Sequence, residues 1–433
     1  MQTPTLSIRG RQHLYFQIIT IIYEGKSIVA GTFVEFFSEE ALENVMVVLK
    51  YKPDRVVYIG HKSNMITKKV NSLREFVKRT SPDTELKFIE VSRENLDQII
   101  DVLTDLVERY RDAKFELTGG SELILIAFGF VSARMPVDTL RIDPYTGTEI
   151  DLSGSEPVRI KSHIEMSVAD NMVLHGGSLT NLTGSYSTWR FTDDFREDIR
   201  AIWKIAKMLR NKWNKYVSTI EEVIKAHPAD ELGYYVLPKQ NLGEAVELFH
   251  RLREVGVIRE LHIAKRTISF VFKNDMIRHV VTKTGNILEL HVYDVATRGN
   301  SKFTDAIIGA MIDWNGSQKN MVPAGDNYSV NVDTMNEIDV ILMRDTIPTF
   351  ISCKSGKAGS IALHELQTVT SRFGGKYANK VLVMATPCEN NANGISFFKQ
   401  RAKDMHIWVI DDVYSMSDEA LLQKLIKIQG INM

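Results

Sequence analysis

The stretch EIDVILMRDTIPTFISCKSGK (residues 337–357) decides the fold of the C-terminal third of this 433-residue chain. Two runs rich in apolar and β-branched residues flank a short polar turn, which is the pattern of a β-hairpin. Asp339 stands near the start of the first run and Lys354 near the end of the second. Since the strands of a hairpin are antiparallel, these two positions meet at one end of it. The sequence therefore predicts a carboxylate and an ammonium group close together.

Regular elements on both sides of this hairpin predict a mixed α/β domain. Residues 284–297 indicate a helix with Glu289 in its first turns, and the residues after the hairpin indicate helix, strand, helix and strand, ending at 406–411. The order helix, strand, strand, helix, strand, with an acid in the first helix and first strand and a lysine in the second strand, is typical of a restriction-endonuclease-like core. We expect that fold for this part of the chain.

These residue types suit the hydrolysis of a phosphodiester. Such a reaction needs an activated water, a cation that neutralises the charge growing on phosphorus, and a helper group near the attacking oxygen. The carboxylates of Glu289 and Asp339 and the backbone carbonyl of Cys353 are hard oxygen ligands, which Mg²⁺ or Mn²⁺ prefers. Lys354 would position the water and lower its pKa. The predicted metal ligands are therefore Glu289, Asp339 and Cys353.

One position departs from the usual motif, in which a second acid stands two residues before the lysine. That position is Ser352, whose oxygen is a weaker and uncharged ligand, and Glu337 or Glu365 could replace the missing acid. The Cys353 thiol is expected to be an ordinary buried strand cysteine rather than a nucleophile. The predicted catalytic residues are Glu289, Asp339, Ser352 and Lys354.

Residues 32–143 alternate short strands with helices of about ten or more residues, which predicts a Rossmann-like domain with a parallel sheet. In such sheets ligands bind beyond the carboxyl ends of the strands. Residues 118–121 (TGGS) follow one strand, and their glycine turn either exposes N–H groups to an anion or is only a tight turn. Ser38 follows another strand and is expected to cap a helix. No GxGxxG fingerprint occurs, which disfavours a dinucleotide cofactor. The predicted ligand-binding residues are Ser38, His61, Thr118, Gly119, Gly120, Ser121 and Glu122.

The middle of the chain predicts loops, a long helix and a winged-helix-like module. Residues 144–190 are rich in Gly, Ser and Thr and indicate hairpins or loops, whereas residues 193–226 indicate one amphipathic helix. Residues 241–274 indicate a helix that ends near Gly256, followed by two strands around a basic turn. The basic residues of this module could meet nucleic acid or form a solvated face between domains. They are Arg251, Arg253, Arg259, Lys265 and Arg266.

Composition narrows the class of protein. A net charge of -1 gives no global basic field, so any contact with nucleic acid must be local. Cys353 and Cys388 are the two cysteines, too few for a disulfide framework, which fits a reducing cytoplasm. The apolar run LYFQIITIIY (residues 14–23) is too short for a membrane span and lacks a signal-peptide cleavage site. We expect a strand there and no membrane partner.

Taken together, these motifs resemble a known family. ELTGGSELILIA (residues 116–127) resembles the glycine-turn motif of CRISPR-associated Rossmann-fold (CARF) sensor domains. TGNILEL, NEIDV, FISCK and RAKDM resemble, in this order, the motifs of the CARF-coupled PD-(D/E)xK nucleases of type III CRISPR systems. Two positions depart from the family pattern, because many relatives have a lysine at the place of Glu122 and a glutamate at the place of Ser352.

The resemblance implies a CARF domain at residues 1–185, a helical and winged-helix-like linker at 186–275 and a PD-(D/E)xK nuclease domain at 276–433. It also implies a homodimer whose sensor domains jointly bind a cyclic oligoadenylate, most often the tetramer. Binding would switch on the metal-dependent cleavage of DNA, with RNA as a further substrate. The ligand pocket would be made by the loops at Ser38 and at residues 118–121 of both subunits.

Two other functions stay open at this point. The sensor domain could cleave its own cyclic ligand beside an inert nuclease-like domain, which Ser352 keeps in play. Alternatively, the winged helix could serve a transcription regulator with a degenerate nuclease scaffold, which would bind a duplex without breaking strands. The presence of Glu289, Asp339 and Lys354 argues against this regulator.

Overall fold

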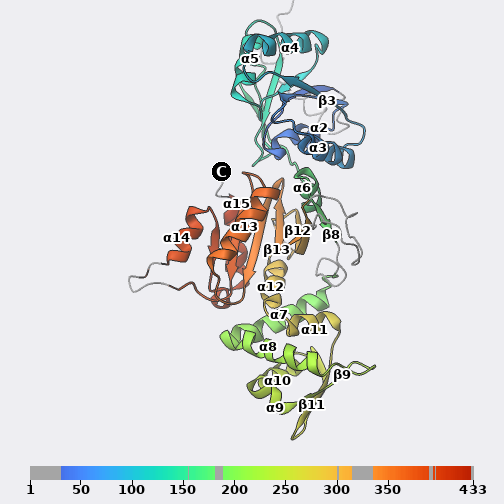
Figure 1. The fold of residues 1–433 in the computed structure, drawn as a ribbon, viewed down its shortest axis with the longest axis vertical. Coiled ribbons are helices and arrows are strands. Elements are labelled where there is room, and N and C mark those ends of the chain that lie inside the picture. Colours follow the sequence, from blue (N-terminus) through green and yellow to red (C-terminus); the bar gives the residue numbers. More distant parts are fainter. Residues whose placement is uncertain are drawn as a thin grey trace, which may run out of the picture. The chain divides into compact units, whose positions relative to one another are not determined.

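The computed structural model describes residues 31–154, 156–180, 189–299, 302–314, 335–389, 394 and 396–430. The chain divides into two compact units, Met1–Ile164 (unit 1) and Glu165–Met433 (unit 2), whose elements are labelled in Figure 1. The strand expected at residues 14–23 lies outside the described residues. None of the helices in the described ranges is long and apolar enough to cross a membrane.

Unit 1 has the Rossmann-like architecture that the sequence predicts. Its sheet has the order β3-β2-β1-β4-β5-β6-β7. The first five strands in this order are parallel, and β6 and β7 follow β5 in antiparallel pairing. The strands are β1 (Thr32–Phe36), β2 (Arg55–His61), β3 (Glu85–Val91), β4 (Lys114–Glu116), β5 (Asp138–Ile142), β6 (Glu149–Asp151) and β7 (Val158–Ile160). The helices are the 3₁₀ turn η1 (Ala41–Asn44), α2 (Met46–Tyr51), α3 (Thr67–Thr80), α4 (Leu96–Arg109) and α5 (Glu122–Ser132).

The helices of unit 1 form where sequence signals place them. In α4, the side chain of the N-cap residue Asn95 accepts a hydrogen bond of 3.0 Å from the N–H of Gln98. Ile99, Leu103 and Leu106 then recur at helical spacing and are buried in the core of the unit. Burial of nearly every residue of β1 and β2 follows from helices on both faces of the sheet.

Unit 2 contains a six-stranded sheet of order β16-β15-β14-β13-β12-β8. The β14, β15 and β16 strands are parallel, and the remaining neighbours are antiparallel. The strands are β8 (Ser178–Thr180), β12 (Asp305–Asp313), β13 (Met335–Arg344), β14 (Ile347–Lys354), β15 (Asn379–Met384) and β16 (Trp408–Ile410). The helices near this sheet are α6 (Val168–Leu174), α11 (Asp275–Thr282), α12 (Asn286–Ala296), α13 (Ser360–Phe373), α14 (Phe397–Asp404), the 3₁₀ turn η5 (Val413–Ser415) and α15 (Asp418–Gly430).

The segment that begins unit 2 differs from the loops expected at residues 144–190. The helix α6 begins after its N-cap residue Ser167, whose side chain accepts a hydrogen bond from the Asp170 N–H. The strand β8 pairs with β12 at the edge of the unit 2 sheet. Because these hydrogen bonds are made within unit 2, the division between the units falls at residues 164 and 165, upstream of the expected boundary at 185. The strand β12 itself was not identified from the sequence.

The helix expected at residues 193–226 is two helices, α7 (Asp193–Leu209) and α8 (Asn211–Ala226). Arg210 between them has a φ of 48°, outside the helical range, so the backbone turns there. Buried residues of both helices, including Ile202, Trp213 and Ile220, contribute to one core with the sheet of unit 2. The expected apolar stripe is thus confirmed, whereas the single helix was wrong.

A winged-helix-like module follows α8. Its remaining elements are β9 (Tyr234–Pro238), α9 (Lys239–Leu242), the 3₁₀ turn η3 (Gly243–Ala245), α10 (Val246–Glu254), β10 (Ile258–Ile263) and β11 (Thr267–Phe272), with a sheet of order β10-β11-β9. The expected end of the helix near Gly256 agrees with the last residue of α10, and Gly256 has a φ of 76° that suits glycine. Figure 1 shows this module at the end of unit 2 away from the six-stranded sheet.

Candidate functional site

The hairpin of β13 and β14 brings Asp339 and Ser352 together. The strands pair in antiparallel register as far as Val340 and Ile351, and Asp339 is the next residue beyond the last pair. Asp339 Oδ2 accepts a hydrogen bond of 2.5 Å from the backbone N–H of Cys353 and one of 3.3 Å from the Ser352 hydroxyl. The carboxylate is therefore held by the neighbouring strand at the place where the two strands part.

Glu337 and Lys354 lie further along the same two strands. The ladder ends with the pair of 340 and 351, so neither residue is paired across it. Glu337 and Asp339 are two residues apart on one strand, and Ser352 and Lys354 are two residues apart on the other, so each pair lies on one side of its strand. In the described part of the chain no direct ion pair joins Lys354 to Glu289 or Asp339, although its charge acts on both.

Glu289 enters the site from α12. This helix begins after Gly285, which has a φ of 96°, and a Cβ atom built on Gly285 would lie 3.5 Å from Glu289 Oε1 and 4.0 Å from Ser355 Oγ. Glycine at this position therefore permits the turn into the helix and brings the backbone close to the carboxylate. The Glu289 carboxylate lies beside the end of β14, as the sequence predicts.

The charges of these acids act on one another. Burial and the charges of Asp339 and Glu337 raise the pKa of Glu289, against the opposing charges of Lys283 and Lys354. Burial also raises the pKa of Asp339, whereas the N–H of Cys353 and the charge of Lys354 lower it. Carboxylates held close together in a buried place repel one another, and a cation between them would relieve that repulsion.

The two carboxylates suit an octahedral cation such as Mg²⁺ or Mn²⁺. Such an ion typically binds one or two carboxylates and keeps several waters. Glu289 and Asp339 provide these carboxylates. Within the described residues, no group of three or more His, Cys, Asp or Glu is placed so that it could hold a metal ion by itself. An ion held by Glu289 and Asp339 would therefore need water or phosphate oxygens to complete its coordination.

Of the two acids considered as replacements for Ser352, the structure brings only one near the described site. Glu337 acts on the pKa of both Glu289 and Asp339, whereas Glu365 is exposed on α13 and has no such effect. The Cys353 thiol is buried, and burial raises its pKa well above the ordinary value, with further raising by Asp339 and Glu289. It is a packed thiol, as expected, and a poor nucleophile.

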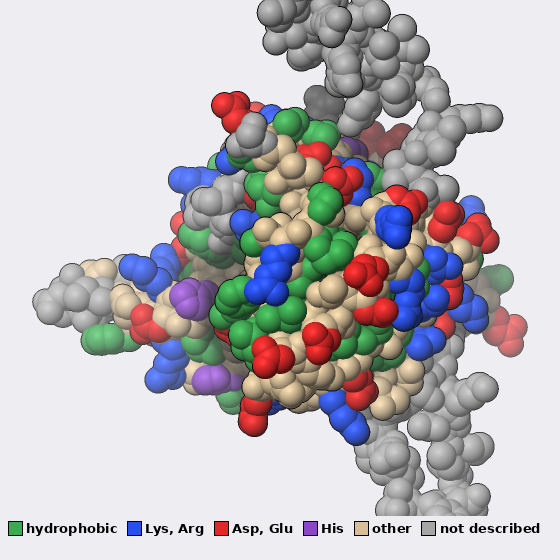
Figure 2. All heavy atoms as spheres, turned by 90° about the horizontal axis from the view of Figure 1, so that it is seen from above, with side chains coloured by type: hydrophobic (Ala, Val, Ile, Leu, Met, Phe, Trp, Pro, Cys, Tyr) green, Lys and Arg blue, Asp and Glu red, His purple; other side chains and the backbone are tan. Residues whose placement is uncertain are grey.

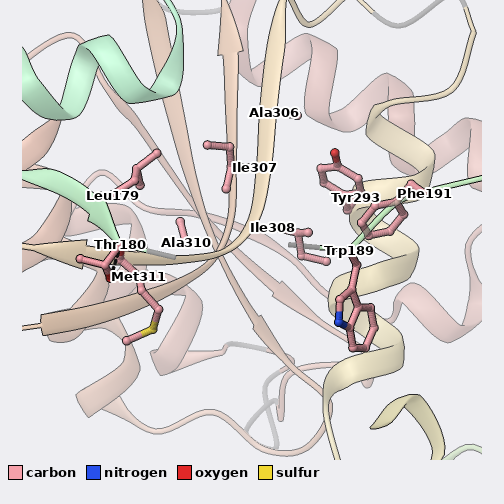
Figure 3. Close-up of a pocket in the computed structure, with 10 residues that line it drawn as sticks. All are labelled: Leu179, Thr180, Trp189, Phe191, Tyr293, Ala306, Ile307, Ile308, Ala310 and Met311. Carbon is pink, nitrogen blue, oxygen red and sulfur yellow. Dashed lines mark hydrogen bonds between the residues drawn. The ribbon is translucent and has the colours of Figure 1, made fainter. Parts of the chain in front are cut away.

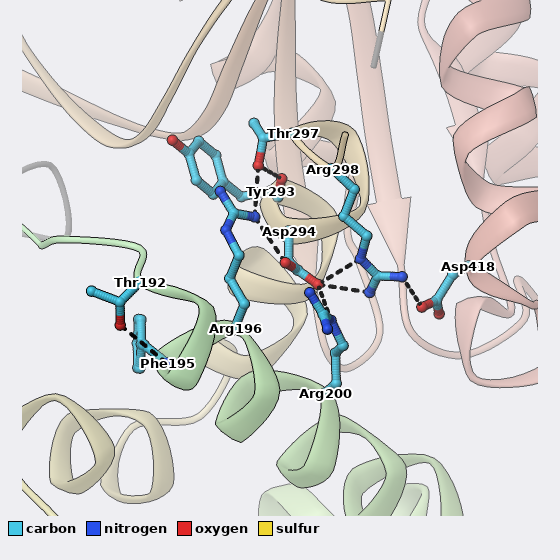
Figure 4. A network of polar contacts seen from close by, with 9 residues as sticks. All are labelled: Thr192, Phe195, Arg196, Arg200, Tyr293, Asp294, Thr297, Arg298 and Asp418. Carbon is cyan, nitrogen blue, oxygen red and sulfur yellow. Dashed lines mark hydrogen bonds and ion pairs between the residues drawn. The ribbon is translucent and has the colours of Figure 1, made fainter. Parts of the chain in front are cut away.

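A buried aspartate ties α12 to α7 and was missed by sequence reasoning. Asp294 is 0% exposed and accepts hydrogen bonds from Arg196 (2.8 Å), Arg200 (3.2 Å) and Arg298 (2.6 Å), as Figure 4 shows. Arg298 also pairs with Asp418 of α15 at 2.7 Å. Because Glu289 stands on the same helix as Asp294, this network fixes the helix that carries Glu289.

A second tie reaches the strand that carries Lys354. Asn214 Nδ2 on α8 donates a hydrogen bond of 3.1 Å to the carbonyl of Ser355, directly after β14. The α7 and α8 helices thus contact both elements of the site. These contacts join residues far apart in the sequence, so no local pattern could have indicated them.

In unit 1, the loop after β1 and the loop after β4 lie together. The Ser38 hydroxyl donates to Glu43 (2.5 Å) and accepts from the N–H of Glu40 (3.1 Å). Ser38 is not the cap residue of η1, which is Glu40, so the expected helix cap was wrong. A Cβ atom on Gly119 would lie 2.8 Å from the Phe36 carbonyl and 2.9 Å from Ser38 Cβ. Because Gly119 has no side chain, the two loops can pack directly against each other.

The glycine turn at residues 118–121 also depends on Gly120. Its φ is 104°, and an added Cβ would lie 2.6 Å from Phe36 Cβ, so only glycine fits. Thr118 hydrogen-bonds to Glu116 and donates to the carbonyl of Ile142 at 2.8 Å. Glu122 is exposed at the first position of α5.

His61 and Ser121 form a hydrogen-bonded pair at this edge. His61 Nε2 lies 2.7 Å from Ser121 Oγ, and His61 Nδ1 lies 3.3 Å from the Val91 carbonyl. A carbonyl only accepts, so a neutral His61 donates from Nδ1 and its Nε2 accepts the Ser121 proton. The predicted ligand residues on β2, the β4 loop and α5 are thus brought together in unit 1.

Two buried acids lie beneath these loops and were not singled out in the sequence. Burial raises the pKa of Glu116 to about 7, despite its hydrogen bonds from Thr118 and Ile142. Burial, with the charge of Glu116, raises the pKa of Glu35 well above its usual range.

The surface shown in Figure 2 mixes side chains of both signs of charge with hydrophobic side chains.

A small cavity of about 130 Å³ in unit 2 is separate from the acidic site. Figure 3 shows Trp189, Phe191 and Tyr293 on one side of it and Leu179, Thr180 and Met311 on the other. The described residues of its lining include no acid, base or histidine. The cavity therefore lacks the groups that hydrolysis needs.

Comparison with known proteins identifies the fold. No protein-family model matches the sequence, and no curated protein matches it. Protein VC1899 from Vibrio cholerae is similar in structure, with a TM-score of 0.72 and 14% identity over 92% of this chain and 99% of that chain. Can2 from Sulfobacillus thermosulfidooxidans, solved in complex with cyclic tetra-adenylate, has a TM-score of 0.65 and 18% identity over 93% of this chain and 98% of that chain. The expected α/β fold class is thus confirmed.

Proposed function

We propose that this chain is a metal-dependent endonuclease of type III CRISPR defence, switched on by a cyclic oligoadenylate and active in the cytoplasm. Its substrate would be DNA, which it nicks or cleaves, with RNA as a second substrate. The observation that carries this proposal is the convergence of Glu289, Asp339 and Lys354 where β13 and β14 part. The fold shared with Can2, a protein solved with cyclic tetra-adenylate, supports the nature of the activator.

The chemistry follows from the positions of these side chains. Glu289, Asp339 and the Cys353 carbonyl would hold Mg²⁺ or Mn²⁺, which when bound neutralises charge on the phosphate and acidifies a water. The hydrogen bond from the Cys353 N–H favours the ionised form of Asp339 and holds its carboxylate in one orientation. Lys354, near both acids but paired with neither, would orient the attacking water and stabilise its hydroxide form. The attacking water releases a proton to solvent as its oxygen bonds to phosphorus, the bond from phosphorus to one bridging oxygen breaks, and that oxygen takes up a proton from solvent.

In unit 1, the activator would bind at the loops that contain Ser38, Thr118 and Ser121. The N-terminus of α5 and the glycine turn present N–H groups, which suit the phosphates of a cyclic oligoadenylate. The exposed Glu122 opposes that charge, so we expect a positive contribution from elsewhere in the pocket, such as a second subunit.

A homodimer is supported by α5. Its outer face exposes Leu125, Ile126 and Phe130, with Ile126 at 52% and Phe130 at 46%. Apolar side chains grouped on one helix face commonly mark an interface. Because α5 begins directly after Ser121, a second copy seated on this face about a twofold axis would place two ligand loops side by side. A ligand shared by both loops would favour one arrangement of the subunits and so switch the enzyme.

A cleavage assay tests the proposal. The full-length protein is incubated with supercoiled plasmid, single-stranded DNA and RNA, with each of several cyclic oligoadenylates and with Mg²⁺ or Mn²⁺. We expect strand breaks only when activator and divalent ion are both present, and none for the Lys354→Ala variant, which should still bind the activator. Equal cleavage with and without the activator would contradict activation by a cyclic oligoadenylate. Full cleavage by the Lys354→Ala variant would contradict the proposed catalytic site.

The His61 and Ser121 pair favours a second candidate function. With Nε2 of His61 as a proton acceptor, the Ser121 hydroxyl or a neighbouring ribose hydroxyl could be activated to cut the cyclic ligand itself. Incubation of labelled cyclic tetra-adenylate with the protein and EDTA would reveal linear product in that case. Its loss in a His61→Gln variant would support this activity, and an intact ring with the unmodified protein would exclude it.

A further inference from the structure

We propose that the winged-helix module of unit 2 is a docking surface for duplex DNA, made by α10 and the β10–β11 hairpin. The surface is separate from the site at Glu289 and Asp339. The inference rests on the proposed function only in that the docked duplex would be the substrate. Its two parts are a helix flank that carries His250 and Arg253 and a hairpin tip that carries Lys265 and Arg266.

The core of the module fixes α10 with one face outward. Leu248, Phe249 and Leu252 are buried, and the rings of Phe249 and Phe270 lie 4.8 Å apart, which packs the helix against the sheet. The opposite face is free of that core. A short helix held rigidly on a small sheet with its outer face exposed is the arrangement by which helix-turn-helix proteins enter a major groove.

The two flanks of the outer face of α10 differ. On one flank, Arg251 pairs with Glu247 at 2.6 Å, and Arg251 and Glu254 line a groove toward α7. On the other flank, His250 and Arg253 are exposed. Arg253 makes no ion pair with any described residue. The arginine of the first flank is thus paired within the chain, whereas Arg253 on the second flank is available to an anion.

The hairpin tip offers a second unneutralised positive surface. Its turn is closed by the Ala264 N–H, which donates to the Thr267 carbonyl at 2.9 Å, and anchored by the Lys239 N–H, which donates to the Arg266 carbonyl at 2.9 Å. The Lys265 and Arg266 side chains are exposed and make no ion pair with a described residue. A firm backbone that presents two free cations suits a contact with phosphates.

Arg259 on β10 adds to this surface, beside Glu260, which is hydrogen-bonded to a tyrosine and keeps its charge. Arg259 is exposed and has no ion pair among the described residues, and the Glu260 carboxylate accepts a hydrogen bond from the Tyr234 hydroxyl. In a chain with a net charge of -1, free cations on both parts of one module are a local concentration of positive charge. Duplex DNA carries about one negative charge per 1.7 Å of its axis and attracts such a surface.

The side chains favour a duplex over a single strand. Proteins that bind single strands stack bases on exposed aromatic rings. In the described α10, β10 and β11, the phenylalanines Phe249, Phe270 and Phe272 are all buried, and these elements contain no tyrosine or tryptophan. The surface therefore offers cations that can contact phosphates and a helix that can enter a groove. It offers no exposed Phe, Tyr or Trp ring of α10, β10 or β11 on which a base could stack.

Binding without cleavage tests this inference. Fluorescence anisotropy of the full-length protein in EDTA is measured with a labelled duplex of ~20 base pairs, about two helical turns, and with its single strand. Salt is varied between ~50 and ~200 mM. The Lys265→Ala/Arg266→Ala variant is compared with Lys424→Ala/Lys427→Ala, which removes the same charge from the exposed side of α15.

We expect the unmodified protein to prefer the duplex and the tip variant to bind it at least ~10-fold more weakly. The slope of log K against log salt should become shallower by about 1.8, since each lost phosphate contact removes about 0.9. The α15 variant should keep both the affinity and the slope. An equal loss in both variants, a preference for the single strand, or no duplex binding would overturn the inference. Because EDTA prevents cleavage, these outcomes do not depend on the nuclease site.

Discussion

Asp339 illustrates how one residue acquires a role from its position in a ladder. It stands one residue beyond the last pair of β13 and β14, where the Cys353 N–H donates to its carboxylate rather than to a strand carbonyl. Ser352 adds a weak hydrogen bond of 3.3 Å but no charge. Ser352 brings no negative charge, whereas the charge of the exposed Glu337 acts on both Glu289 and Asp339.

We therefore predict that Glu337→Gln weakens the binding of Mn²⁺ by roughly ten-fold, equivalent to about 1.4 kcal/mol. The physical reason is the loss of a carboxylate whose charge acts on both Glu289 and Asp339. Calorimetric titration of Mn²⁺ into the full-length protein measures this effect. Glu365→Gln on the exposed side of α13 is the matched control and should leave the affinity unchanged. An equal effect of both changes would rule out a special role for Glu337.

Glu116 makes a pH-dependent contribution to the stability of unit 1. Its pKa is raised from 4.5 to about 7 by burial, so the folded state holds a proton that the unfolded state has released between these pH values. Stability then falls as pH rises through that window. The change amounts to roughly 3 kcal/mol, at 1.36 kcal/mol per pKa unit.

Glu116→Gln should remove this part of the pH dependence, because the amide keeps an oxygen for the Thr118 and Ile142 N–H groups but does not titrate. Urea unfolding of unit 1 in the full-length protein, followed at pH 5 and pH 7.5, measures the difference. We expect a smaller loss of stability in the variant than in the unmodified protein over this range. The same loss in both proteins would refute the raised pKa.

At the scale of elements, α12 and α7 are joined by the ion pairs of Asp294. Asp294→Ala would leave Arg196, Arg200 and Arg298 without their common partner and should lower the free energy of unfolding by roughly 3–5 kcal/mol. Chemical denaturation measures this loss. Glu221→Ala, which breaks the exposed pair with Lys225 on α8, is the control and should cost less than about 0.5 kcal/mol. Similar costs for both changes would mean that the network does not hold α12.

The elements also indicate what a sequence can and cannot predict. The hairpin of β13 and β14 could be predicted because its register follows from one short turn, and α12 because it carries a local helical pattern. The break at Arg210 could not be predicted, because the residues on both sides have good helical spacing and only the packing of α7 and α8 favours two directions. The pairing of β8 with β12 and the contacts of Asp294 join distant segments, so they depend on the tertiary fold. Within unit 1, the glycines of residues 118–121 indicated the turn but not the buried acids Glu35 and Glu116.

At the scale of the whole molecule, the proposed switch requires two copies of the chain. Ile126→Asp places a charge in the exposed apolar face of α5 and should convert a dimer to a monomer, since burying an unpaired carboxylate in an interface is unfavourable. Sedimentation velocity measures the mass, and cleavage with cyclic tetra-adenylate should fall with it. Leu232→Asp is the control, because Leu232 is 80% exposed in the turn before β9. A variant that remains dimeric, or a monomer that is fully activated, would contradict the dimeric switch.

The most direct measurement is a crystal structure of the full-length protein grown with Mn²⁺, with anomalous diffraction recorded for the metal. We predict one strong anomalous peak bound by oxygens of Glu289 and Asp339, with the Lys354 ammonium beside it. The absence of any peak at saturating Mn²⁺, or a peak elsewhere while these three side chains stay apart, would contradict the proposed site.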